Sequence, residues 1–243
     1  HTDAAAAAVT DAAPLPTPQR PDTADVARVG EYGAPLLQAL AAREAALPAT
    51  AGDGLVAALA RIALALQSAD PARLRRQESW WGRLLGRDVE REAEGRGLQS
   101  QLGVLALQAR EQAQQLQQHM DLRAAAISAA GQAAEALEAW ADAGAAWRPT
   151  LDASGRAALA PRIDHLQRLA ALRRIEAGQW QLLQEQDAVL LQRFARIHDV
   201  LLPAWRQAAL AAQAATGAVR AGQAATLHAQ IDDEVAAAQA RLR

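Results

Sequence analysis

The sequence predicts an all-α protein: an elongated antiparallel bundle of long helices with a short N-terminal helical hairpin. Its 243 residues are dominated by Ala, Leu, Gln, Arg and Glu, which are strong helix formers. Aromatic residues make up only 3%, and the alternating runs of β-branched and aromatic residues that a sheet needs are missing. Apolar residues recur instead at steps of three and four, the spacing of one helix face.

Residues 1–33 are expected to form a disordered Ala/Pro-rich tail. Pro14, Pro16, Pro18 and Pro21 stand there among Ala, Thr and Asp. Too few large apolar side chains accompany them to offset the entropy of ordering the chain.

Residues 34–70 are expected to form the helical hairpin. Pro35 suits the first turn of its first helix, and Asp53 can cap its second helix, which ends before Asp70. Residues 71–87 follow as a basic connector that contains tryptophans.

Residues 88–243 are expected to form the bundle of long helices. Apolar or small residues between 88 and 147 recur at about 3.6 residues, which predicts one continuous helix. Five glycines within it could each bend or break it: Gly95, Gly97, Gly103, Gly131 and Gly144. A second long helix is expected at about 157–201, and Pro203 should end it and separate it from a last helix at about 204–241.

Composition excludes several kinds of site. The net charge is −2, so no global field would attract nucleic acid. The chain has no cysteine, which removes thiolate nucleophiles and zinc–thiolate sites. The histidines are scattered without metal-ligand spacing, and no phosphate-binding loop is present. We therefore expect no catalytic residue, no metal and no cofactor, and hence no enzyme.

The lengths of the apolar runs in the sequence indicate where in the cell the protein is expected. No apolar run approaches the roughly 20 residues needed to cross a bilayer, and the first residues lack the pattern of a signal peptide. The expected location is the cytoplasm, with peripheral contact at the inner membrane as an alternative.

Three segments together resemble the core signature of the toxic-anion (tellurite) resistance family, TelA-like. They are RIDHLQ at 162–167, QWQLLQEQDAVLL at 179–191 and LLPAWRQ at 201–207. The residues that match that signature are Arg162, Ile163, Leu166, Gln167, Gln184, Asp187, Val189, Leu190, Pro203 and Trp205. The chain departs from the family pattern at Gly178, at Trp180–Gln181 and at Gln186. The resemblance implies a role in stress response and resistance to toxic anions, but it implies no reaction.

Asp187 is the first candidate site residue, because it is a carboxylate on an apolar stripe that is expected to face a partner helix. The residues of that stripe are Trp180, Leu183, Asp187, Leu190, Phe194, Ile197 and Leu201. A buried carboxylate is costly unless it pairs with an arginine or reaches water. Its role is either to fix helix register or to line a polar notch in a contact surface. The second role gives four partner-contact candidates: Gln184, Asp187, Arg193 and Trp205.

The segment SWWGRLLGR is the second candidate, because its apolar side chains are ringed by arginines. Such a segment either docks back on the helices or lies in a membrane interface or against a partner. The docking candidates are Trp80, Trp81, Arg83, Leu84 and Arg87. Trp140 and Trp147 are a further pair on one helix face, either for packing or as the anchor of an interface.

The function that these observations favour is a TelA-like tellurite-resistance and stress-response protein that acts as a non-enzymatic helical scaffold or adapter. Its partner would be another protein, of unknown identity, and not nucleic acid. The alternative is a peripheral membrane protein that docks through residues 73–87. A third reading is an oxyanion-binding protein that uses its arginines.

Overall fold

The computed structural model describes residues 14–21, 25–43, 52–68, 88–214 and 218–241. Within these ranges every regular element is a helix, and long helices pack together, which confirms the all-α prediction. The helix α6 (Asp88–Trp147) has 60 residues and is continuous through its glycines. The predicted helix at 88–147 is therefore confirmed.

The chain divides into two compact units. The first comprises residues 1–47 and 121–184, and the second comprises residues 48–120 and 185–243. The helices α6 and α7 (Ala153–Ala195) each contribute residues to both units.

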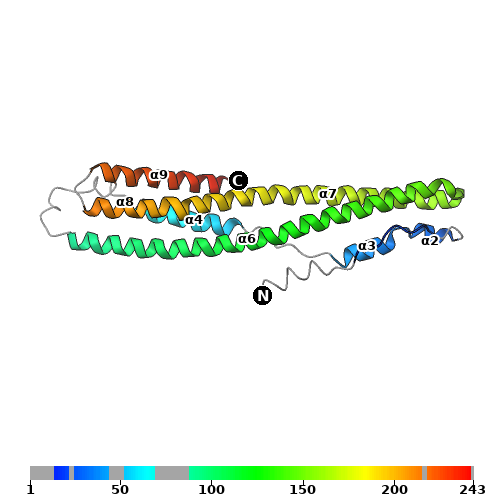
Figure 1. The fold of residues 1–243 in the computed structure, drawn as a ribbon, viewed down its shortest axis with the longest axis horizontal. Coiled ribbons are helices and arrows are strands. Elements are labelled where there is room, and N and C mark those ends of the chain that lie inside the picture. The colour runs from blue at the N-terminus through cyan, green and yellow to red at the C-terminus, as the bar shows by residue number, and fades with distance from the viewer. Residues whose placement is uncertain (1–13, 22–24, 44–51, 69–87, 215–217, 242–243) are drawn as a thin grey trace. The chain divides into compact units, whose positions relative to one another are not determined.

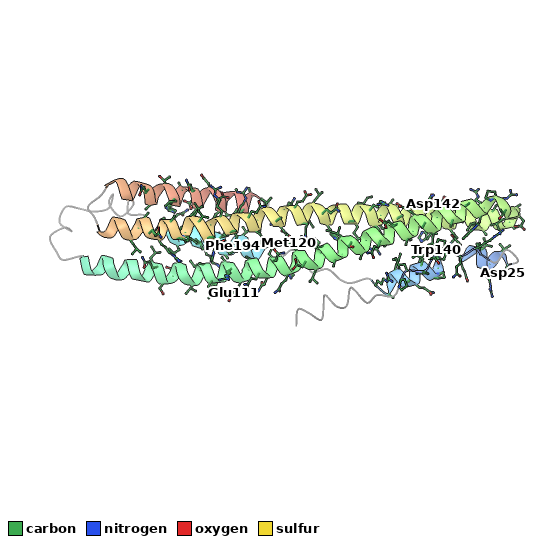
Figure 2. The ribbon with its side chains drawn as sticks, viewed as in Figure 1. Asp25, Glu111, Met120, Trp140, Asp142 and Phe194 are labelled. Carbon is green, nitrogen blue, oxygen red and sulfur yellow. The ribbon has the colours of Figure 1, made fainter. Side chains whose placement is uncertain are left out.

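The first unit contains α2 (Val26–Gly30), α3 (Ala34–Ala41), the last part of α6 and the first part of α7 (Figure 1). A short 3-10 helix, Arg148–Thr150, joins α6 to α7. The core of the first unit is formed by side chains from α2, α3, α6 and α7. Its largest members include Leu36, Leu137, Trp140, Leu159 and Leu166. Figure 2 shows Trp140 on the side of α6 that faces α2 and α3.

Capping side chains and one glycine set the helix boundaries in this unit. The Asp25 side chain accepts a hydrogen bond from the N–H of Ala27 at 2.9 Å, and so caps α2. The Asp152 side chain accepts one from the N–H of Gly155 at 2.7 Å at the start of α7. Gly33 lies before α3 with φ +87°, a conformation that favours glycine, and a Cβ there would lie 3.0 Å from the Leu166 side chain.

The second unit contains α4 (Gly52–Ser68), the first part of α6, the end of α7, α8 (Leu202–Ala214) and α9 (Ala218–Ala240). α9 packs against both α8 and α4. Figure 2 shows Met120 and Phe194 between α6 and α7; Met120 belongs to the core of this unit, and the partly buried Phe194 packs against it. Glu111 lies on the outer side of α6.

Alanine fills much of the interior. Ala109 and Ala134 have no exposed surface, and Ala170 is 1% exposed. Small side chains allow neighbouring helix backbones to come close together, but each buries little apolar area.

The disordered tail expected for residues 1–33 is wrong in part, because residues 26–30 are helical and residues 14–21 contact the rest of the first unit. The short N-terminal helices expected within residues 34–70 are present as α3 and α4, and they contribute to different cores. Residues 1–13 and the connector 71–87 lie outside the described residues.

The prediction that Pro203 ends its helix is also wrong. α7 passes into a π-helical segment, Arg196–Leu201, and then into α8, in which Pro203 is the second residue. The N–H of Leu202 donates to the carbonyl of Ile197, five residues earlier. We attribute the continuation to this wider turn, because it relieves the clash between a proline ring and the preceding α-helical turn. The predicted last helix, 204–241, is in fact two helices, α8 and α9.

Candidate functional site

Asp187 is 2% exposed, and its carboxylate pairs with a guanidinium. Asp187 Oδ1 accepts a hydrogen bond from Nη2 of Arg241, the residue that follows α9. The Arg241 guanidinium also lies against Gly52, where a Cβ would meet Nη1 at 3.1 Å. The pair therefore joins α7, α9 and the start of α4, and it confirms the expectation that a buried carboxylate here pairs with arginine.

Arg193 takes part in a second link between α7 and α9. Its Nη1 lies 2.7 Å from Oε2 of Glu234, and Nη1 of Arg196 lies 2.8 Å from the other oxygen, Oε1. The Glu234 side chain is 13% exposed, whereas that of Arg196 is 59% exposed. Arg193 is thus committed to a contact within the second unit.

The four predicted partner-contact residues do not form one accessible surface. Asp187 and Trp205 are 2% and 7% exposed, and Trp205 belongs to the core of the second unit. Arg193 is paired, and Gln184 is half-buried in the first unit. The buried and paired position of Asp187 supports its structural role, and partner contact through these four residues stays a prediction.

The membrane-docking candidates Trp80, Trp81, Arg83, Leu84 and Arg87 lie outside the described residues, so their role stays a prediction. Among the helices that the structure describes, none is long and apolar enough to cross a membrane. In the same ranges no group of three or more His, Asp or Glu side chains could hold a metal ion.

An exposed apolar stripe on α7 was missed by the sequence analysis. We name it the α7 stripe; it consists of the apolar Leu172, Ile175 and Leu182 and of the polar Gln179, which together lie at steps of three, four and three. Leu172 is 56% exposed, and Ile175 and Leu182 are each 60% exposed. The heptad spacing was visible in the sequence, but only the structure shows that the core uses a different face of α7, with Ile163, Leu166 and Ala170.

A cluster of aromatic side chains lies in the first unit. The Tyr32 and Trp140 ring centroids are 5.2 Å apart, and those of Tyr32 and Trp147 are 6.1 Å apart in an edge-on arrangement. The Tyr32 hydroxyl donates to the carbonyl oxygen of Trp140 at 2.7 Å. Burial raises the pKa of the Tyr32 phenol to about 12.

Two further hydrogen bonds fix this aromatic cluster. Arg162 Nε donates to the carbonyl oxygen of Tyr32 at 3.0 Å. Trp140 Nε1 donates to the carbonyl oxygen of Pro16 at 2.8 Å. Of the two alternatives for Trp140, its position fits packing, because it is 3% exposed in the core and its N–H donates to a residue of the same chain.

Comparison with known proteins gives one informative relationship. No protein-family model and no solved structure matches the chain. Among curated proteins, the chain is similar to "Protein KlaA" of Escherichia coli, with 30% identity over 207 residues. The aligned region covers 77% of this chain and 79% of that protein.

Proposed function

Because the chain belongs to the same family as protein KlaA of Escherichia coli, we propose that it acts in tellurite resistance as a non-enzymatic helical scaffold that binds protein partners. The segments at 162–167, 179–191 and 201–207 resemble the core signature of the toxic-anion (tellurite) resistance family, and this resemblance supports the resistance part of the proposal. The scaffold part rests on the α7 stripe.

The α7 stripe has the properties of a helix-binding surface. Leu172 and Leu182 are ten residues apart, which places them about 15 Å apart along the helix axis. The intervening Ile175 and Gln179 keep the heptad spacing by which a second helix can pack its own side chains between them. Three large apolar side chains that are more than half exposed gain from burial against a partner.

We assign the surface to an amphipathic helix of a partner protein. Residues at i, i+3, i+7 and i+10 are those that contact a helix laid along a helix face. The polar Gln179 between apolar neighbours favours one register of the partner over others, as polar residues do in coiled coils. Asp187 is not part of this surface, because it is 2% exposed.

The test is a crosslinked pull-down with the full chain from tellurite-stressed cells, read by mass spectrometry and paired with a survival assay. The triple variant Leu172→Gln/Ile175→Gln/Leu182→Gln should lose a stoichiometric partner and reduce tellurite survival. The matched control is Val104→Gln/Leu107→Gln, which changes two α6 side chains that are 55% and 58% exposed. It should keep both properties.

Circular dichroism must show that both variants keep the helical content of the wild type. A folded triple variant that still recovers its partner and still supports survival would contradict the proposal. Loss of both properties in the control variant would show that exposed apolar side chains matter in general, which would also contradict it.

A further inference from the structure

The sequence of residues 14–21 is rich in proline and has the pattern typical of a polyproline II helix. It contains Pro14, Pro16, Pro18 and Pro21 and has no helical residue. Leu15, Pro18 and Pro21 are half-buried at a spacing of three residues, and Pro16 beside Leu15 is half-buried as well. The other four residues are exposed. A spacing of three is that of the polyproline II helix, which has three residues per turn.

Specific contacts hold this segment on the first unit. Leu15 packs against the core that contains Tyr32 and Trp140. The indole N–H of Trp140 donates to the carbonyl oxygen of Pro16 at 2.8 Å. Four residues further on, Arg20 Nη2 donates to the Thr150 hydroxyl oxygen at 3.0 Å. That hydroxyl in turn donates to the carbonyl oxygen of Trp147 at 2.7 Å, which fixes its orientation.

These contacts are of the kind by which proteins read proline-rich peptides. A polyproline II helix makes no internal hydrogen bonds, so its carbonyl oxygens are free to accept from a donor such as an indole N–H. Trp140 is 3% exposed, and a buried indole N–H needs an acceptor. The site therefore selects an extended backbone that presents a carbonyl, one apolar side chain before it and a guanidinium four residues after it.

From this geometry we propose that the first unit is a binding site for proline-rich segments of partner proteins, and that residues 14–21 occupy the site in cis. The ligand it fits has the pattern Leu-Pro-x-Pro-x-Arg, which is the sequence of residues 15–20. The inference rests on the proposed scaffold function, since it names the chemistry of a partner. A tethered segment competes at a high effective concentration, so a partner must displace it in order to bind.

The experiment uses the full chain and a fluorescein-labelled peptide with the sequence of residues 14–21, PLPTPQRP. Fluorescence anisotropy measures its binding to the wild type and to Leu15→Asp, in which a charge disfavours the docked tether. Leu15→Asp should bind the peptide about tenfold more tightly than the wild type, because the competitor has been released. Adding Thr150→Val should weaken that binding several-fold, because the hydroxyl that accepts from Arg20 is gone.

Thr226→Val is the matched control in the Leu15→Asp chain, since Thr226 is also exposed and its hydroxyl donates to a carbonyl oxygen, that of Gly222. It should leave the peptide affinity unchanged. Absence of saturable binding to a folded Leu15→Asp chain would overturn the inference, as would equal binding of a peptide in which alanine replaces every proline. Equal affinity of wild type and Leu15→Asp would overturn occupation in cis.

Failure of the peptide to bind would not affect partner recovery through the α7 stripe. Conversely, the triple stripe variant should still bind the peptide once Leu15→Asp is added. The two proposals therefore fail separately.

Discussion

At the scale of single residues, the sequence predicted that a buried side chain needs a partner more easily than it predicted which residue that partner is. The sequence indicated that Asp187 would need an arginine or contact with water, because a buried lone carboxylate is costly. It did not indicate Arg241, which is 54 positions away and is brought close only when α9 folds back on α7. Tyr32 was not flagged, since it lies in a segment whose composition suggested disorder. Its burial depends on a core formed by residues more than 100 positions further along the chain.

The raised pKa of the Tyr32 phenol predicts how the stability of the fold depends on pH, and this pKa can be measured directly. Tyr32 is the single tyrosine, so tyrosinate absorbance in the ultraviolet follows it alone. The pKa of this phenol should be about 12 in the folded chain and near the ordinary tyrosine value of 10.0 in denaturant. Between these values the unfolded chain loses the proton and the folded chain keeps it, so stability should fall as the pH rises through that window.

Tyr32→Phe is the control for this titration. Without the phenol, the contribution of residue 32 to the pH dependence of the free energy of unfolding should vanish between these two pKa values. A folded-state pKa near 10.0 in the wild type would show that the phenol is not buried as described.

At the scale of elements, periodicity predicted the length of α6 and the existence of α7, because one face of each helix must be apolar along its packed length. The apolar stripe beyond Asp187 was also predicted, and Leu190 of α7 is buried, as are Ile197 and Leu201 of the π-helical segment that follows. Leu183, assigned to the same face, is instead 42% exposed. The effect of Pro203 was wrong, because a π-helical turn is a property of the backbone in its packed context and leaves no clear mark on the apolar pattern.

Two glycines of α6 that look alike in the sequence should respond oppositely to alanine. A Cβ at Gly144 would lie 2.9 Å from the Tyr32 ring and 3.1 Å from Ile163, so Gly144→Ala should destabilise the chain by about 1–3 kcal/mol. At Gly131 a Cβ would meet nothing within 4 Å, so Gly131→Ala should stabilise it by roughly 0.5–1 kcal/mol. Urea denaturation measures both, and equal effects would show that the close contact at Gly144 is absent.

At the scale of the whole molecule, the sequence predicted one bundle after residue 88, whereas the structure has two compact units with a core in each. This division could not be read from periodicity, since α6 and α7 run through both units without interruption. It depends on where the shorter helices pack. α2 and α3 contribute to one core, and α4, α8 and α9 contribute to the other.

Separate cores predict that damage to one unit stays local. Asp187→Leu leaves the Arg241 guanidinium, which is 20% exposed, without its carboxylate, and should cost about 3 kcal/mol. Hydrogen exchange should then rise in α9 and α4 but not in α2 and α3. The double variant Asp187→Leu/Arg241→Leu should recover most of the loss, because no uncompensated charge remains. A rise of exchange in both units alike would contradict local opening.

The alanines in the interior affect how this protein can be mapped by mutation. Replacement by alanine, the usual way to find which side chains matter, leaves positions such as Ala109, Ala134 and Ala170 unchanged, although they are among the least exposed in the molecule. Substitutions that enlarge these side chains would separate the helices, and would reveal contacts that a scan by truncation cannot detect. Natural sequence change faces the same asymmetry, since these positions can tolerate almost no growth in volume.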